Sequence, residues 1–369
     1  MTAGPLSQMD RVVGTLLLAV IVLLWVTGVV MLYGTWLPWL FDLHRIAGFS
    51  LIALIPFKIT TISQSWLRGT GWTLDRKVGL LLSVVLAGWI LLIIVLGISW
   101  MWRLGPYSSL HQTLITWHWI LGVLILPVFA LHAWRGWPRP QKEDFLSRRS
   151  FLKLLGLVGG STVFARWADY LAEAQSTEAS PRRFTGSRGF GSFAGNDFPV
   201  TGESKVELDP GQWQLAVSGA VHSPLTLAYQ DILAFQQLTV TEAIDCHNGW
   251  YSVQAWQGIP LANLLEKARL KENVTGVRMV SATGLSNTHP LGEARQILLA
   301  THVSGQVLDA SHGFPLRAVI PGRRGWFWLK WLTRIEVLDD PIEVVGGILC
   351  TPLQVFRELN HPRASSDIP

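Results

Sequence analysis

The sequence predicts a multi-domain protein in which an all-α bundle of four transmembrane helices precedes an α+β domain that is mainly β. Of its 369 residues, 49% are hydrophobic and only 15% are charged, which is too apolar for an ordinary soluble protein. The apolar residues form long runs over the first 140 positions, whereas short alternating segments with Gly and Pro between them begin at Trp213. A net charge of +5, concentrated beside the apolar runs, indicates no nucleic acid partner.

These patterns divide the chain into five predicted segments. Residues 175–205 are rich in Ser, Gly and Arg without periodicity, which is typical of a linker or a wrapping arm. Two cysteines, Cys246 and Cys350, allow at most one disulfide. The predicted segments are a four-helix membrane domain (1–140), an internal signal-like segment (141–174), the linker (175–205), the mainly β domain (206–340) and a C-terminal extension without an interpretable motif (341–369).

Four apolar stretches are the predicted membrane spans. The run from Val12 to Leu32 contains no charged residue in 21 positions. At a rise of about 1.5 Å per residue, it is long enough to cross a hydrocarbon core of roughly 30 Å. Val78 to Met101 and Leu114 to Trp134 are similarly apolar. The remaining stretch, residues 40–62, is the second span in chain order and is apolar except at Asp42, His44, Arg45 and Lys58.

The basic residues predict the orientation of these spans. Eight lie before the first span, between the second and third, or after the fourth, and only Arg45 and Arg103 oppose them. By the positive-inside rule, these three regions are cytoplasmic, so the second and fourth spans both begin at the outer face. The eight residues are Arg11, Lys58, Arg68, Arg76, Lys77, Arg135, Arg139 and Lys142.

Two histidines lie near the starts of these parallel spans. His44 and His118 are each followed four residues later by a glycine, Gly48 and Gly122, which leaves space for a flat macrocycle on the same helix face. A histidine near a helix end can be merely interfacial, but ionisable residues within a membrane are functional candidates by default. Residues 10–137 resemble four-helix membrane cytochromes b. The resemblance implies one haem b between His44 and His118.

A second haem remains an open alternative. His132 follows His118 by fourteen residues, which on a straight helix places it about 21 Å further along and turned by only about 40°. The matching position on the second span is Lys58, an unusual ligand that can equally be a propionate partner or a snorkelling interfacial residue. We expect His111 to be interfacial.

The segment after the fourth span contains the motif SRRSFLK, with Arg148 and Arg149, followed by the apolar run LLGLVGGSTVFA. It resembles a twin-arginine export signal, although a basic juxtamembrane linker is the alternative. The resemblance implies that the twin-arginine translocase exports a folded, cofactor-loaded domain. Cleavage after Ala165 or Ala174 and retention as a short fifth span are both open, and Arg166 and Asp169 indicate that any span ends before them.

The mainly β domain carries several separated motifs. Predicted strands are WQLAVSGAV, QLTVTEAIDC, GVRMVSA, LRAVIP and RIEVL, and predicted helices are LTLAYQDILAF and PLANLLEKA. The pieces WQLAVSGAVHSPLTLAYQDI, DCHNGW with WQGIPLANLL, SATG with HPLGEA, and HGFPLRAVIPGRRGWFWLKWLTRIEV resemble the sulfite-oxidase-type molybdopterin domain in order and spacing. The resemblance covers roughly residues 195–338 and implies an enzyme, a molybdenum-dependent oxidoreductase.

The resemblance implies specific site residues. Cys246 matches the catalytic, molybdenum-binding cysteine, and a soft thiolate is a good ligand for such a metal. The Gly-rich turn from Gly322 to Gly325 suits a phosphate, while Arg323 and Arg324 can equally be solvated surface charges. The residues implied for the molybdopterin are Asn196, Ser281, His312, Arg317 and Lys330.

The predicted activity is oxygen-atom transfer, with electrons exchanged through haem b and the quinone pool of a cell membrane. After Cys246 the chain has His247-Asn248-Gly249-Trp250, without the arginine that sulfite oxidases use for an anionic substrate. Reduction of an S-oxide or N-oxide at the extracytoplasmic side is therefore favoured. The alternatives are a sulfite-type oxidase that passes electrons into the membrane, and a non-catalytic haem-binding electron-transfer protein.

Overall fold

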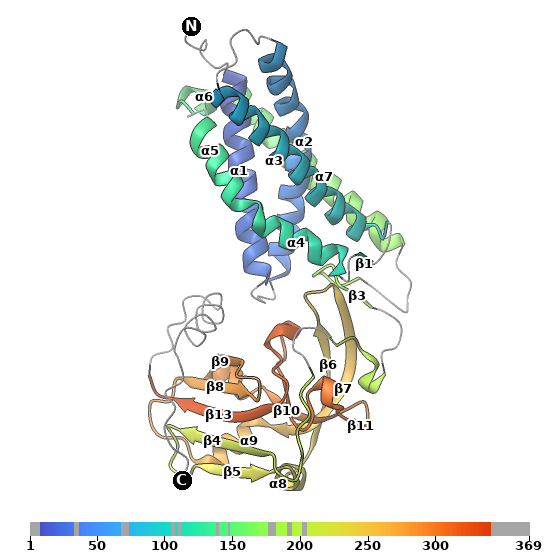
Figure 1. Ribbon diagram of the computed structural model, residues 1–369, viewed down its shortest axis with the longest axis vertical. Coiled ribbons are helices and arrows are strands. Elements are labelled where there is room, and N and C mark those ends of the chain that lie inside the picture. The colour runs from blue at the N-terminus through green and yellow to red at the C-terminus, as the bar shows by residue number, and fades with distance from the viewer. Residues whose placement is uncertain are drawn as a thin grey trace. The chain divides into compact units, whose positions relative to one another are not determined.

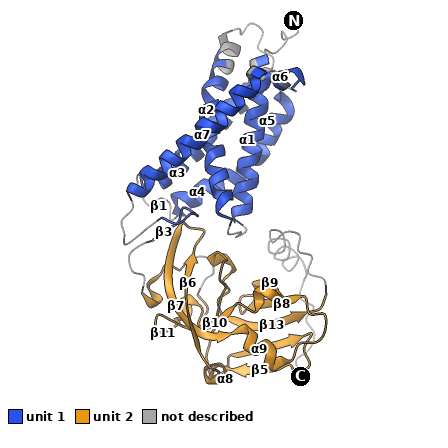
Figure 2. Cartoon of the chain, turned by 180° about the vertical axis from the view of Figure 1, so that it is seen from behind, with its two compact units in different colours: residues 1–32, 37–188 blue, residues 33–36, 189–369 orange. Residues whose placement is uncertain are grey.

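The computed structural model describes residues 8–32, 37–67, 74–104, 108–109, 112–137, 140–146, 148–175, 182–189, 194–200 and 205–340. The chain divides into two compact units (Figures 1 and 2), residues 1–32 with 37–188 and residues 33–36 with 189–369. The first unit is helical and the second is mainly β, as the sequence predicts. The boundary after residue 188 falls within the predicted linker.

Three long helices in the first unit correspond to the first three predicted spans. They are α1 (Gln8–Leu32), α2 (Pro38–Leu67) and α3 (Leu74–Met101). Each contains a stretch that is long and apolar enough to cross a membrane: Arg11–Leu32, Pro38–Thr60 and Lys77–Met101. The first three predicted spans are therefore helices, and α1 packs against α2.

The fourth predicted span is formed by two helices with a bend between them, so it is not confirmed as one continuous helix. α4 (Leu114–Leu124) and α5 (Leu126–Gly136) meet at Ile125 with a bend of 41°. Pro127 lies in the first turn of α5, where it lacks an N–H donor and its ring disfavours a straight helix. Over the described residues, the bent pair makes a fourth span only if its two helices count as one.

The signal-like segment forms α7 (Arg148–Ala174), which follows the short helix α6 (Glu143–Leu146). α7 continues through Arg166 and Asp169, and it packs against α2. Ala165, Ala168 and Ala172 are buried in a cluster with Phe49 of α2. Arg166 pairs with Asp42 at 3.1 Å and Asp169 with Arg45 at 3.4 Å, so these two charges of α7 are paired with charges on α2.

The second unit contains two sheets. The first has the order β5 (Leu225–Ala228), β4 (Gln214–Gly219), β13 (Leu332–Leu338), β8 (Gly276–Ser281) and β9 (Ser286–Pro290). Only the β4–β13 pair in this sheet is parallel. In the second sheet, β7 (Trp250–Pro260) pairs with β6 (Leu238–Asp245) and β10 (Leu298–Val303), and β10 also pairs with β11 (Gln306–Val307) and β12 (Arg317–Val319).

Short helices and one hydrophobic core complete this unit. Fully buried Trp256, Leu264, Met279, Leu299 and Ile335 belong to one contiguous cluster that joins both sheets. The segment Leu225 to Phe235, which the sequence predicts as helical, begins instead as β5, because Leu225 to Ala228 pair with β4. The short helices are α8 (Tyr229–Ala234), α9 (Leu261–Ala268), α10 (Leu291–Ala294), and the 3-10 turns η1 (Gly195–Asp197), η2 (Ala310–His312) and η3 (Gly325–Phe327). The first unit also contains a two-stranded sheet of β1 (Ser108–Ser109) and β2 (Gln112–Thr113), and β3 (Arg188–Gly189) lies at the boundary of the two units.

Candidate active site

Cys246 lies in the tight turn that connects β6 to β7. The turn is closed by two backbone hydrogen bonds, from the Cys246 N–H to the Trp250 carbonyl at 2.8 Å and from the Gly249 N–H to the Cys246 carbonyl at 3.0 Å. Gly249 has φ +83°, a conformation that favours glycine. The Asn248 N–H donates to Sγ of Cys246 at 3.5 Å, so a backbone dipole already points at the sulfur that a metal would need as a thiolate.

Arg324 is buried beside this turn and is not a solvated surface charge. Arg324 is 7% exposed. Its Nη2 donates to the Cys246 carbonyl at 2.8 Å and to Oδ1 of Asp245 at 3.2 Å. Asp245 is fully buried. The Nε of Arg324 is buried and has no hydrogen-bond partner within the part of the chain that the structure describes. A buried donor without an acceptor fits an acceptor supplied by a bound group.

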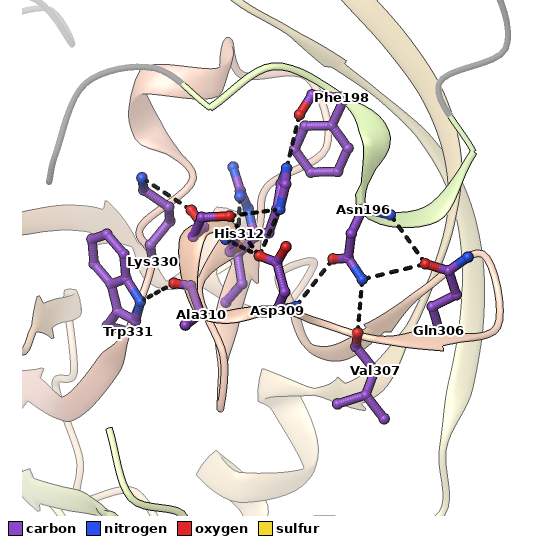
Figure 3. A network of polar contacts seen from close by, with 11 residues as sticks. Asn196, Phe198, Gln306, Val307, Asp309, Ala310, His312, Lys330 and Trp331 are labelled. Atoms are coloured by element: carbon purple, nitrogen blue, oxygen red, sulfur yellow. Dashed lines mark hydrogen bonds and ion pairs between the residues drawn. The ribbon is translucent and has the colours of Figure 1, made fainter. Parts of the chain in front are cut away.

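Four of the five residues expected to bind the molybdopterin meet around η2 (Figure 3). The amide of Asn196 donates to the Val307 carbonyl at 2.9 Å and accepts from the Asp309 N–H at 3.1 Å. The His312 ring contacts the Phe198 carbonyl through Nε2 at 2.8 Å and the Asp309 carboxylate through Nδ1 at 2.7 Å. Against the effect of its burial, hydrogen bonds from Ser311 and His312 lower the pKa of Asp309.

Two buried cations complete this cluster. Nη1 of Arg317 donates to the His312 carbonyl at 2.8 Å, and Nζ of Lys330 donates to the Ser311 carbonyl at 3.5 Å. Arg317 is 5% exposed and Lys330 is 8% exposed. Cations are rarely buried to this degree unless an anion or many acceptors stabilise them. The donor set therefore fits an anionic, phosphate-bearing cofactor such as molybdopterin.

Ser281, the fifth predicted residue, lies at the end of β8 on the other sheet. It is 3% exposed, and its hydroxyl accepts from the Thr283 N–H at 3.3 Å. The adjacent Ala282 N–H donates to the Trp331 carbonyl at 2.8 Å, which places Ser281 beside the segment that carries Lys330.

One aromatic ring joins the cysteine turn to the cationic cluster. The Phe198 ring centre lies 6.0 Å from that of Trp250, which follows the turn, and 4.1 Å from that of His312. The guanidinium of Arg317 lies 5.8 Å from the same ring. The Phe198 ring thus connects Trp250, four residues after Cys246, with His312 and Arg317, which the chain separates widely from the cysteine.

A further polar cluster flanks the site, and the sequence did not single it out. Arg323 makes two hydrogen bonds to the Glu293 carboxylate, at 2.7 and 3.0 Å, and buried His289 lies 3.4 Å from the same carboxylate. Burial acts to raise the pKa of Glu293, but hydrogen bonds from His289 and Arg323 outweigh it and lower this pKa to about 2. The motif HPLGEA contains two of these residues, and Arg323 comes from the Gly-rich turn.

In the helical unit, His44 and His118 face each other with ring centres 6.3 Å apart and ring planes at 77°. Nδ1 of His118 lies 2.8 Å from the Ile93 carbonyl, to which it donates. Nδ1 of His44 lies 2.8 Å from Oγ1 of Thr27. Because the Thr27 hydroxyl donates to the Leu23 carbonyl, it accepts from His44. Both protons then lie on Nδ1, which leaves each Nε2 lone pair for a metal. Two imidazole nitrogens that share one metal ion at about 2 Å each bring their ring centres to roughly this separation.

Glycines of the neighbouring helices make room for the two imidazole rings, whereas the predicted pair, Gly48 and Gly122, faces open space. No atom lies within 4 Å of a Cβ added at Gly48 or Gly122. By contrast, a Cβ at Gly97 of α3 would lie 3.0 Å from Cε1 of His118, and one at Gly28 of α1 would lie 3.5 Å from Cε1 of His44. Helices α1 and α3 therefore approach the histidines closely because Gly28 and Gly97 lack side chains.

The remaining predicted residues are placed less specifically. His132 lies in α5 beyond the bend, so the straight-helix relation to His118 does not hold. Lys58 lies on α2, and His111 lies outside the described residues. Arg148 and Arg149 form the start of α7, where Arg148 is exposed.

Comparison with known proteins identifies the β unit. The protein-family model of the oxidoreductase molybdopterin-binding domain matches residues 202–344 of this chain. The oxidoreductase YuiH of Bacillus subtilis (strain 168) is 35% identical over 148 residues, which cover 39% of this chain and 75% of that protein. The catalytic subunit MsrP of the protein-methionine-sulfoxide reductase of Gluconobacter oxydans (strain 621H) is 26% identical over 269 residues, 62% of this chain and 85% of MsrP. The NADPH nitrate reductase of Beauveria bassiana is 28% identical over 186 residues, 42% of this chain and 21% of the enzyme.

Proposed function

Because the chain belongs to the family of oxidoreductases with a molybdopterin-binding domain, we propose that it is a membrane-anchored enzyme that reduces an S-oxide or N-oxide by oxygen-atom transfer. The observation that carries the proposal is the convergence of the Cys246 turn and a buried cationic cluster on one site. The similarity to a subunit named as a methionine sulfoxide reductase supports an S-oxide as the substrate.

In this proposal, Cys246 supplies the protein's sulfur ligand to molybdenum. Arg317 and Lys330 hold the phosphate of the molybdopterin, while Asn196, His312 and Ser281 bind its polar edges. When bound, the cofactor would supply the two-electron oxygen-atom-transfer chemistry. The protein would orient it, and partly buried Cys246 packs against the hydrophobic cluster that contains Trp250 and Phe198.

His44 and His118 are the residues that would hold one haem b, and this haem would pass single electrons between the quinone pool and the molybdenum site. The facing rings, the Nδ1 hydrogen bonds and the two glycines support this assignment. His132 is retained only as a ligand of a second haem. Export by the twin-arginine translocase would bring the molybdopterin domain to the outer side of the membrane, where the second and fourth predicted spans begin.

Metal analysis and optical spectroscopy of the detergent-purified protein test both cofactors. We expect near-stoichiometric molybdenum that Cys246→Ser removes, and a haem b spectrum that His118→Ala removes. Gly97→Ala should also weaken haem binding, because its added Cβ would crowd the His118 ring. Gly88→Ala, on the same helix but with no atom near its Cβ, is the matched control. Haem without molybdenum would instead favour a non-catalytic electron-transfer protein, and molybdenum without haem would refute the proposed electron route.

A further inference from the structure

Arg324 links two consecutive residues at the end of β6. A single nitrogen, Nη2, donates both to the Asp245 carboxylate at 3.2 Å and to the Cys246 carbonyl at 2.8 Å. The side chain of Arg324 is 8% exposed and that of Asp245 is fully buried, so little solvent screens this ion pair. The contact spans 78 residues of sequence and therefore depends on the fold.

The backbone next to Arg324 lies against β6. Gly325 approaches this strand so closely that an added Cβ would lie 3.3 Å from Cγ1 of Ile244 and 3.5 Å from the Asp245 carbonyl oxygen. Arg324 consequently reaches the cysteine turn from backbone that lies beside this strand.

We propose that Arg324 is a positioning residue for the metal-binding sulfur of Cys246. By holding the Asp245 carboxylate and the Cys246 carbonyl, it fixes the backbone from which the Cys246 side chain projects, and so the direction of Sγ. The sequence has no arginine soon after the cysteine, and the fold supplies one from the Gly-rich turn. The inference rests on the proposed ligation of molybdenum by Cys246.

Charge alone does not explain the arrangement. Nη2 belongs to a planar guanidinium whose N–H bonds point in fixed directions, whereas lysine carries the same charge on a flexible stem with donors that rotate freely. Arg324→Lys therefore keeps a cation near Asp245 and loses the bridge. Arg323→Lys is the matched control, since it makes the same exchange one residue earlier in a side chain that points to Glu293. The full-length protein is purified in detergent for each variant.

Three readouts separate positioning from stability: molybdenum content, thermal unfolding, and the absorption band from charge transfer between cysteine sulfur and molybdenum. We expect Arg324→Lys to retain molybdenum and a folded domain but to shift the charge-transfer band, whereas Arg323→Lys leaves the band unchanged. If Arg324→Lys fails to fold, the double variant Asp245→Asn/Arg324→Gln removes both buried charges and should show the same shift.

The outcomes distinguish this inference from the function on which it rests. A molybdenum-loaded wild type whose band is unchanged in Arg324→Lys and in the double variant would overturn the positioning role alone. A band that shifts equally in Arg323→Lys would also overturn it, because the effect would then belong to the whole turn. Wild-type protein without molybdenum would overturn the proposed function together with this inference.

Discussion

At the residue scale, buried charges around the cysteine turn are paired across long stretches of sequence. Arg324 lies against Asp245, and Arg323 lies against Glu293. Adjacent arginines thus point to different acids on different elements. The sequence left open whether these arginines were surface charges, because a turn rich in Gly and Arg is compatible with solvent exposure. Their partners became evident only when α10 and the end of β6 were brought to the same turn.

The depressed pKa of Glu293 predicts a pH dependence of stability. Its pKa falls from 4.5 to about 2 in the folded protein, so the ionised form stabilises the fold. This contribution, about 3 kcal/mol, is complete above pH 4.5 and is lost as the pH falls towards 2. Glu293→Gln should therefore lower the melting temperature of the domain at pH 7 and much less at pH 3.

The exposed acid Glu272 provides the control for this measurement. Glu272→Gln should leave the melting temperature nearly unchanged at both pH values, because surface carboxylates contribute little. A Glu293→Gln variant whose melting temperature differs from wild type by the same amount at pH 7 and pH 3 would contradict the ionised Glu293 as the source of stability.

At the element scale, β7 is the central strand of its sheet, and the sequence did not predict it. Its eleven residues include Gln254, Gln257 and Gly258, which interrupt a recognisable strand pattern. β6 was predicted because its residues alternate more regularly. Similarly, α4 and α5 were predicted as one helix because apolar composition shows a span better than it shows a bend. Pro127 was the available signal for that bend.

Gly258 should be essential for the antiparallel pairing of β7 with β10. A Cβ added there would overlap the Leu299 carbonyl oxygen and lie 2.6 Å from Cα of Ala300. β10 cannot easily move away, because β12 pairs with the same residues on its other edge. Gly258→Ala should destabilise the domain by about 3 kcal/mol or more, measured as a lower melting temperature and weaker molybdenum retention.

Gly292→Ala in α10 is the corresponding control, since no atom lies within 4 Å of its added Cβ. This variant should melt close to wild type, because alanine is favoured over glycine in a helix. Equal melting temperatures for the Gly258 and Gly292 variants would show that the two strands separate more easily than their pairing indicates.

At the scale of the whole molecule, the chain combines a helical unit that contains membrane-spanning candidates with an oxidoreductase unit. The last long helix of the helical unit is α7, whose first residues resemble a twin-arginine signal and whose later residues pack on α2. Export of the oxidoreductase unit should therefore depend on Arg148 and Arg149. This dependence makes the topology of the whole chain testable through two residues.

Exchange of both arginines for lysine should trap the oxidoreductase unit on the cytoplasmic side, because lysine retains the charge but not the guanidinium. Protease added to spheroplasts should then leave residues 206–340 intact, whereas it digests linker sites in wild type. Arg135→Lys, outside the signal motif, should behave as wild type. Equal digestion of the double variant and wild type would refute twin-arginine export.

The sequence alone determined the division into a helical and a mainly β part and the oxidoreductase family, and it singled out the candidate cysteine. Long apolar runs and motifs of fixed spacing are local properties of the sequence, so they can be recognised before the fold is known. The cysteine turn is also local, since Cys246 and Gly249 close it through backbone hydrogen bonds.

Only the tertiary structure decided which distant groups meet. It brought Arg324 to Cys246, Phe198 between Trp250 and His312, and Gly97 against His118. Each contact joins separate elements, and no short-range pattern encodes which side chain fills the space that another leaves. Packing and the pairing of buried charges depend on the whole arrangement of the chain, so these contacts could be identified only in the three-dimensional structure.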